Sequence, residues 1–172
     1  HINDIDLMSP ETKVKTKKKL SKFSVKIAYP DQWRDYSTLK VQSPAQGASL
    51  YSNLKNVSAW QYQKSLEKVG KAVDKAEWGM SPQTVNAYYS GSNNEIVFPA
   101  AILQPPFYNP NADAAVKFGG IGAVIGHEIS HGFDDSGSRF DGDGNLNNWW
   151  TEQDRKNFDA KVAQLAAQYN VY

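Results

Sequence analysis

The chain has 172 residues, a formal net charge of +1, 40% hydrophobic residues and 12% aromatic residues. This length is enough for one domain with a real core, and the composition excludes a disordered chain. The near-neutral charge gives no bulk attraction to nucleic acid or to acidic substrates. Cysteine is absent, which excludes disulfides, cysteine zinc sites and a thiol nucleophile, and is compatible with a reducing compartment as well as with bacterial secretion.

No apolar run is long enough to span a membrane, and no signal peptide is recognisable. His1 stands where an initiator Met belongs, so we expect a trimmed chain whose targeting cannot be read. The compartment is therefore unknown, with the bacterial cytoplasm favoured and the cell surface or secretion as alternatives.

Residues 9–29 are predicted to form a helix, with Ser9 as its N-cap and Pro10 at its first position. The segment is strongly basic through Lys13, Lys15, Lys17, Lys18, Lys19 and Lys22. We interpret these lysines as a solvated helix face, with a nucleic-acid or membrane patch as the alternative.

Residues 45–75 are predicted to form one or two helices, because large apolar residues recur there at helical spacing. We interpret these positions as core: Leu50, Leu54, Val57, Trp60, Leu66, Val69 and Val73.

The pattern changes at Thr84. Residues 84–90 and 95–98 are predicted to be the two strands of a hairpin, and Gly91 opens the turn between them. Proline-rich, irregular chain follows as far as Pro110.

A buried helix is predicted over residues 113–132, opened by Asp113 and ended by Gly132. Its glycines are costly in a helix and indicate close packing against a neighbour or a ligand: Gly119, Gly120, Gly122 and Gly126. A last helix is predicted from a Thr151 cap to about Gln168, with Asp154 at the capping-box position.

The sequence His127-Glu128-Ile129-Ser130-His131 falls late in the apolar helix. Residues four apart share one helix face, so both imidazoles can bind one metal ion, and Glu128 can take a proton from the water that zinc activates. This H-E-x-x-H pattern predicts a zinc peptidase site. The alternative is a pair of ordinary histidines on a helix.

A hydrolytic zinc site needs a third protein ligand besides its water. His1 is the only other histidine and can be a tag remnant, so a carboxylate is expected. Glu152 is a weak candidate at a thermolysin-like spacing, but Lys156 replaces the Asp that should follow it, and Glu152 also reads as a first-turn acid of the last helix.

Longer motifs resemble the neprilysin family of zinc peptidases (gluzincins). Because the chain lacks cysteine, it resembles the bacterial members of this family most. The motifs are Val85–Ser90, Asn94–Phe107, Phe118–Asp135 and Asn148–Trp150. The match is strong over residues 84–151 and looser over 8–80. It implies a mainly α fold with a small β hairpin or sheet, as part of a thermolysin-like zincin catalytic domain with adjoining helices.

The resemblance also implies residue roles. His127 and His131 match zinc ligands and Glu128 matches the general base, so Zn²⁺ is the expected cofactor. Asn86 and Ala87 match an edge-strand pair that binds the substrate backbone, which agrees with the use of strand edges as peptide templates. Three apolar residues match positions near the specificity pocket, with plain core as the alternative: Ile102, Phe107 and Val124.

Two acidic groups follow the motif. Asp134 is a candidate partner for a ligand imidazole, or else a helix-end residue. Asp141-Gly142-Asp143-Gly144-Asn145 resembles the start of a calcium loop, but Leu146 occupies the position where that loop needs Gly, so a simple turn is favoured.

In this family the third ligand is a Glu in an E-x-x-x-D motif further downstream, and no such motif precedes Tyr172. We therefore expect a fragment: residues 1–83 as a partial helical segment leading into the catalytic domain, and residues 84–172 as a C-terminally incomplete catalytic core. The parent is expected to be an endopeptidase that cleaves oligopeptides on the amino side of hydrophobic residues. The alternative is an inactive or structural module. The expected partners are a peptide substrate and the missing parts of the enzyme, not nucleic acid.

Overall fold

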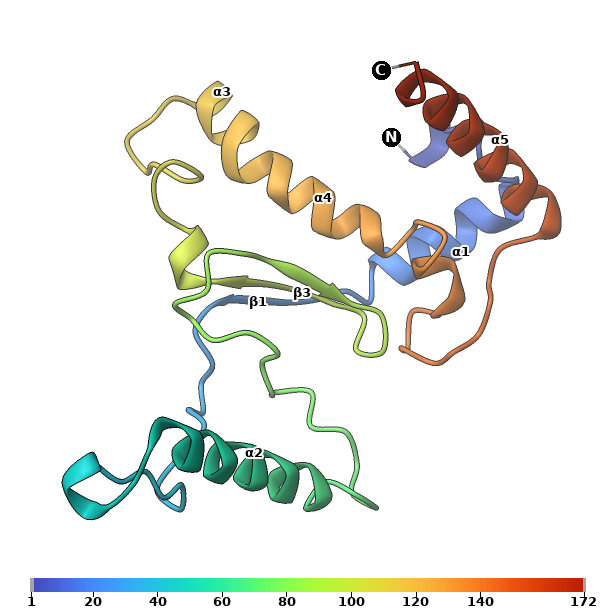
Figure 1. Ribbon diagram of the computed structural model, residues 1–172. Helices are drawn as coiled ribbons and strands as arrows, with labels where there is room; N and C mark the ends of the chain where they lie inside the picture. Colours follow the sequence, from blue (N-terminus) through green and yellow to red (C-terminus); the bar gives the residue numbers. More distant parts are fainter. Residues whose placement is uncertain (1, 172) are drawn as a thin grey trace. The chain divides into compact units, whose positions relative to one another are not determined.

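The structure is a computed structural model that describes residues 2–171 (Figure 1). It is mainly helical with one small three-stranded sheet, which confirms the predicted fold class. The chain forms two compact units: one holds the N-terminal residues up to Tyr29 and the residues from Trp78 onward, and the other is Pro30–Glu77. The predicted domain boundary after residue 83 stays a prediction. None of the helices within residues 2–171 combines the length and apolarity needed to cross a membrane.

The Pro30–Glu77 unit contains one long helix, α2 (Leu50–Leu66). Ser49 caps it, accepting a hydrogen bond from the Ser52 amide at 3.1 Å. The helix has no buried residue, so the interpretation of its apolar positions as core is wrong for the chain as described. Leu50 is 77% exposed, because no other element of this unit packs against it. Trp60 is held differently, by stacking on Tyr36 and by donating a hydrogen bond to Thr38.

The other unit begins with α1 (Pro10–Leu20), whose cap is Ser9 as predicted. The predicted continuation of this helix to residue 29 is wrong, because β1 (Ser24–Ala28) follows instead. Ser24-Val25-Lys26-Ile27-Ala28 alternates polar and apolar residues and pairs with a neighbouring strand. Hydrogen bonding to that strand overrides the local helix preference.

The sheet has the order β1-β3-β2. β2 (Tyr88–Ser90) and β3 (Glu95–Pro99) form the predicted antiparallel hairpin, and β1 pairs with β3 in parallel. The central strand β3 is buried along its whole length, whereas β2 is an edge strand. The first hairpin strand begins at Tyr88, so its prediction from Thr84 is wrong by four residues.

The helix predicted over residues 113–132 is present in three consecutive parts. They are α3 (Ala114–Lys117), a π-helical turn (Phe118–Gly122) and α4 (Ala123–His131). Asp113 caps the start, accepting from the Val116 amide at 3.0 Å. The prediction that glycines mark close packing is correct at Gly120, where a Cβ would lie 2.6 Å from the Phe107 carbonyl oxygen. Close packing against a neighbouring residue is wrong at Gly119 and Gly126, where a Cβ would meet nothing within 4 Å, and packing against a ligand stays a prediction there.

The main core lies between this helix and the sheet, as Figure 1 shows for α4 above β3. Buried residues come from the hairpin region and from the π-helical turn: Ala87, Ile96, Phe98, Ile102 and Ile121. Val124 and Ile129 of α4 pack against them, and this fixes the motif helix on the sheet.

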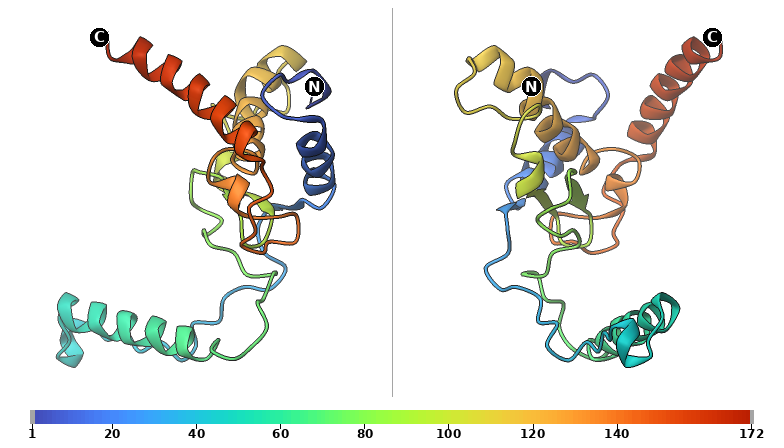
Figure 2. Two further views of the ribbon diagram at one scale, coloured as in Figure 1. Left: turned by 90° about the vertical axis from the view of Figure 1, so that its right-hand side faces the viewer. Right: turned by 60° about the vertical axis from the view of Figure 1, so that its left-hand side comes forward.

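A second core holds α5 (Glu152–Tyr169), which extends away from the sheet (Figure 2). Met8, Trp149 and Trp150 are its buried residues. Thr151 and Asp154 form the predicted capping box at the start of α5. The carboxylate of Asp154 also accepts hydrogen bonds from Ser9 and Thr12, which joins α1 to α5.

Candidate metal site

His127 and His131 lie one turn apart on α4, so their imidazoles project from the same side of the helix. Their Nε2 atoms are 3.0 Å apart, and the two rings are nearly perpendicular, at 81°. Two nitrogen ligands of one tetrahedral zinc, each about 2.05 Å from the metal, lie about 3.3 Å apart. The pair therefore fits a single ion with little adjustment.

Asp134 orients the second imidazole. Its Oδ2 atom lies 2.9 Å from Nδ1 of His131. With the carboxylate ionised, Nδ1 carries the ring proton and donates a hydrogen bond to Asp134. The lone pair of Nε2 is then free for a metal. Oδ1 of the same carboxylate accepts the amides of Ser136 at 3.0 Å and Gly137 at 2.7 Å. Backbone amides of the loop after α4 thus fix the carboxylate of Asp134, and this carboxylate orients the ring of His131.

Glu128 follows the first histidine directly on α4, but its environment is different. Glu128 is only 5% exposed, whereas His127 is exposed and His131 is partly exposed. The helix therefore places an acidic group with limited solvent contact beside two accessible imidazoles.

The part of the chain that the structure describes contains no group of three metal-binding side chains. Glu152, the weak candidate for a third ligand, is an exposed residue in the first turn of α5. His1 lies outside the described residues. The histidine pair thus offers two candidate ligands, and residues 2–171 bring no third metal-binding side chain to it.

The segment with the calcium-loop pattern is a turn. Oδ1 of Asp141 accepts the amides of Asp143 at 2.9 Å and Asn145 at 3.1 Å, which lowers the pKa of Asp141 against the opposing effect of burial. Asp143 pairs with Lys22 at 2.6 Å. Gly144 has a φ of +86°, which suits a glycine in a tight turn. These carboxylates are engaged within the turn and with Lys22.

The predicted substrate-binding residues divide into two groups. Asn86 and Ala87 come just before the edge strand β2, not within it, and Oδ1 of Asn86 accepts the Ala87 amide at 2.9 Å. Asn86 is exposed and Ala87 is buried. Of the three apolar candidates, Ile102 is in the core at 3% exposure, Val124 packs against that core, and Phe107 is 37% exposed.

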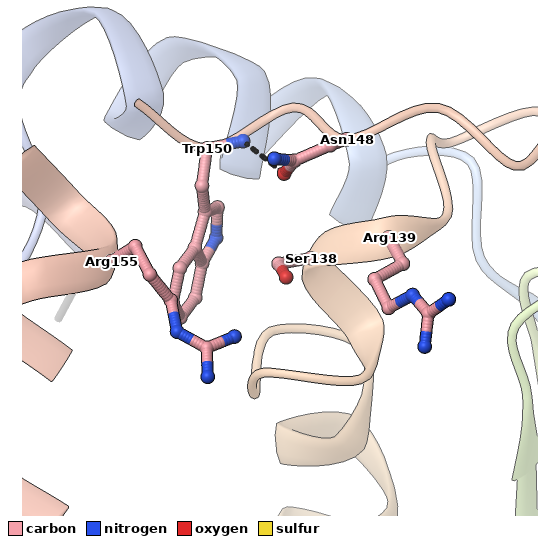
Figure 3. Close-up of a pocket in the computed structure, with 5 residues that line it drawn as sticks. All are labelled: Ser138, Arg139, Asn148, Trp150 and Arg155. Atoms are coloured by element: carbon pink, nitrogen blue, oxygen red, sulfur yellow. Dashed lines mark hydrogen bonds between the residues drawn. The ribbon is translucent and has the colours of Figure 1, made fainter. Parts of the chain in front are cut away.

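A cavity of about 280 Å³ lies apart from the histidine pair, near the start of α5 (Figure 3). Its lining includes Ser138, Arg139, Asn148, Trp150 and Arg155, and none of the motif residues. Arg155 is paired with Asp159 at 2.9 Å. The indole nitrogen of Trp150 is buried and has no hydrogen-bond partner within residues 2–171.

Lys19 is a residue near the site that the sequence pattern does not reveal. Its assignment to a solvated helix face is wrong, because its exposure is only 2%. Its ammonium donates to the carbonyl oxygens of Gly137 and Phe140 in the loop after α4. Burial lowers the pKa of Lys19 to about 8, although the carboxylates of Asp134 and Asp141 act in the opposite direction. The one available signal is its place on the face shared with Thr12 and Thr16, which are also buried.

Several proteins are similar to this chain over almost its whole length. Neprilysin-11 of Caenorhabditis elegans is 43% identical over 171 residues, covering 97% of this chain and 20% of that protein. Neutral endopeptidase of Lactococcus lactis is 42% identical over 164 residues, covering 95% of this chain and 26% of that protein. The zinc metalloprotease Zmp1 of Mycobacterium tuberculosis, solved with an inhibitor, superposes with a TM-score of 0.90 at 52% identity, covering 99% of this chain and 25% of that one.

The chain therefore spans about a fifth to a quarter of the length of these relatives. The family model for peptidase family M13 matches residues 86–172. This stretch contains the hairpin, His127, His131 and α5. The sequence motifs, the fold and these matches lead to one assignment: the chain belongs to peptidase family M13, the neprilysin family.

Proposed function

We propose that this chain provides the metal-binding helix of a zinc-dependent endopeptidase, with His127 and His131 as two zinc ligands. The observation that carries the proposal is the approach of the two Nε2 atoms to 3.0 Å, with Asp134 bound to the opposite nitrogen of His131. Membership of a family whose relatives are named zinc metalloprotease and neutral endopeptidase supports both the metal and the reaction.

The third ligand is proposed to be a carboxylate of the whole protein that lies outside residues 2–171. A hydrolytic zinc site uses three protein ligands, and the described residues supply two. The relatives are several times longer than the chain, which leaves room for this group elsewhere in the protein.

Glu128 is proposed to act as the general base. A zinc ion in such a site supplies Lewis acidity, which makes water more acidic and polarises the scissile carbonyl. Glu128 then accepts a proton from the attacking water and transfers it to the amine of the leaving product.

The substrate is proposed to be an oligopeptide bound in extended form beside the edge strand. Asn86 offers an exposed side-chain amide next to β2, and extended peptides commonly bind along strand edges. A preference for cleavage on the amino side of hydrophobic residues is proposed to depend on Phe107, Ile102 and Val124. Phe107 is the most exposed of these, which supports a direct contact between its ring and a substrate.

Glu128→Gln in the full-length protein tests the mechanism. We expect peptide hydrolysis to fall about 10²–10⁴-fold, because the amide cannot accept the proton. Zinc content, measured by elemental analysis, should stay unchanged, because Glu128 is not a ligand. Glu11→Gln is the matched control, since Glu11 is exposed and paired only with Lys15 on α1. Retained hydrolysis in Glu128→Gln would contradict the assigned base, and a zinc-free wild-type protein would contradict the metal site.

A further inference from the structure

The ammonium group of Lys19 is held inside the protein by the loop that follows the motif helix. It donates hydrogen bonds to the carbonyl oxygens of Gly137 at 2.8 Å and Phe140 at 2.7 Å. Three aromatic rings surround it, with centroids 5.3–5.8 Å from Nζ: Trp149, Tyr89 and Phe133. A buried lysine is rare without such partners, because desolvation of its charge is costly.

These contacts fix the peptide groups on both sides of Gly137. The carbonyl oxygen of Gly137 accepts from Lys19 and also from Nε1 of Trp149, at 3.1 Å. The amide of Gly137 donates to Oδ1 of Asp134 at 2.7 Å. Any shift of this residue therefore changes the hydrogen bond that Asp134 receives.

The path ends on the imidazole. Oδ2 of Asp134 is 2.9 Å from Nδ1 of His131, and Nε2 of that ring faces His127. Three short hydrogen bonds thus lead from Lys19 through Gly137 and Asp134 to His131.

The loop has little freedom to adjust. A Cβ at Gly137 would overlap the carbonyl oxygen of His131 and the backbone of Gly132, so the chain folds back tightly on the end of α4. On the other side of Lys19, its own carbonyl oxygen accepts from the buried Asn94 at 3.2 Å, and Asn94 also donates to Gly142 at 3.0 Å. Lys19 is therefore fixed at its backbone as well as at its ammonium.

We propose that Lys19 is a positioning residue for the zinc site: it sets the loop that aims Asp134 at His131. This proposal rests on the proposed function, since it assumes that His131 is a ligand. The ammonium donates to carbonyl oxygens and does not itself contact a ligand ring, so its influence passes through the loop. Partners of ligand imidazoles commonly change metal affinity by 10- to 100-fold when they are lost.

Lys19→Met in the full-length protein tests this. Methionine keeps an unbranched side chain, one atom shorter than that of lysine, and removes the ammonium donor from both carbonyl oxygens. The oxygen of Phe140 then loses its Lys19 partner, and that of Gly137 keeps only Nε1 of Trp149. We expect about a tenfold weaker zinc affinity, measured by competition with a chromophoric chelator. The visible absorption spectrum of the Co²⁺-substituted protein should also change, because the angle of the His131 ring changes. Lys18→Met is the matched control, since Lys18 is an exposed neighbour on α1, and it should match the wild type.

Trp149→Phe is a second variant, useful if Lys19→Met fails to fold. It keeps an aromatic ring beside the ammonium and removes only the second donor to Gly137, so we expect a smaller loss of zinc affinity, of a few-fold, with a changed Co²⁺ spectrum. A purely structural role would lower the unfolding temperature of the zinc-free protein and leave affinity and spectrum as in the wild type. That result in Lys19→Met, or in Trp149→Phe if Lys19→Met does not fold, would overturn the proposal. If the wild type itself binds no zinc, the proposed function fails instead, so the two failures are distinguishable.

Discussion

The two nitrogens of the His131 ring have different surroundings, and this decides which one can bind a metal. Nδ1 faces the carboxylate of Asp134 and Nε2 faces the neighbouring imidazole. An anionic acceptor keeps the proton on Nδ1, so Nε2 retains its lone pair. Asp134 can hold this geometry because two backbone amides, of Ser136 and Gly137, bind its other oxygen.

Asp134→Asn should therefore weaken zinc binding. The backbone amides would bind the side-chain carbonyl oxygen of Asn and leave its NH₂ group facing His131. That group is a donor, so Nδ1 would have to accept and the proton would move to Nε2, the nitrogen needed for the metal. We expect zinc affinity to fall about 10- to 100-fold, measured by chelator competition in the full-length protein. Asp135→Asn, an exposed neighbour, should bind zinc normally, and an unchanged affinity in Asp134→Asn would contradict this role.

Sequence spacing was enough to place the two histidines and to suggest Asp134, because all three lie within two turns of one helix or just after it. Helical geometry is local and regular, so residues four apart must share a face. Lys19 is different, since 118 residues separate it from the carbonyl oxygen of Gly137 that it binds. Only the helix face that it shares with Thr12 and Thr16 distinguishes it from its exposed neighbours, and its burial depends on how α1 packs.

At the scale of elements, Asp154 links the first helix to the last. Its carboxylate accepts from the Thr12 hydroxyl at 2.5 Å, the Thr151 hydroxyl at 2.5 Å and the Ser9 amide at 2.6 Å. Burial alone would raise the pKa of Asp154, but these hydrogen bonds outweigh it and lower the pKa to about 2. A capping residue of α5 thus also anchors the start of α1.

This pKa gives a pH dependence with a definite sign. An aspartate with a depressed folded-state pKa binds fewer protons when folded, so it contributes stability above its unfolded pKa of about 4. That contribution should be lost as the pH falls from about 4 through about 2. Asp154→Asn should lower the free energy of unfolding at pH 6 by about 1.5–3 kcal/mol and flatten this part of the pH profile. Urea unfolding of the chain between pH 6 and pH 2 measures both effects.

The control for this experiment is Asp159→Asn. Asp159 lies one turn further along α5 and forms an exposed pair with Arg155, at 2.9 Å. Exposed pairs contribute less than about 1 kcal/mol, so the control should stay close to the wild type. An equal loss of unfolding free energy in both variants would show that the hydrogen bonds between Asp154 and α1 contribute no more stability than an exposed ion pair.

The element boundaries show where local sequence reasoning stops. The caps at Ser9, Asp113 and Thr151 are correct because a capping residue bonds within its own first turn. β1 is missed because Ser24–Ala28 becomes a strand through pairing with β3, about 70 residues later in the chain. The start of the hairpin is displaced for a similar reason, since β3 pairs only with residues 88–90. Pairings between distant segments decide these cases.

On the scale of the whole molecule, the chain spans about a fifth to a quarter of the length of its M13 relatives, and the described residues bring together only two candidate metal ligands. The apolar face of α2 is exposed within its own unit, although the sequence pattern marks it as core. The same pattern occurs in α4, which does pack on the sheet. Periodicity predicts which face of a helix is apolar, but only the tertiary structure shows what covers it.

Zinc removal should reveal how far the metal contributes to the stability of the full-length protein. A ligand that binds only the folded state stabilises it, by about 2.7 kcal/mol at a hundredfold excess over its Kd. We expect a chelator to lower the unfolding temperature of the wild type, and readdition of zinc to restore it. His131→Ala should unfold at the same temperature with and without chelator, because one of the two ligands on α4 is lost. Glu128→Gln should keep the full chelator effect while losing hydrolysis, since its role is proton transfer and not coordination. Differential scanning calorimetry of the wild type, His131→Ala and Glu128→Gln, together with a hydrolysis assay, thus separates the ligand role of His131 from the base role of Glu128. A chelator effect that persists in His131→Ala would mean that the stabilising metal binds elsewhere.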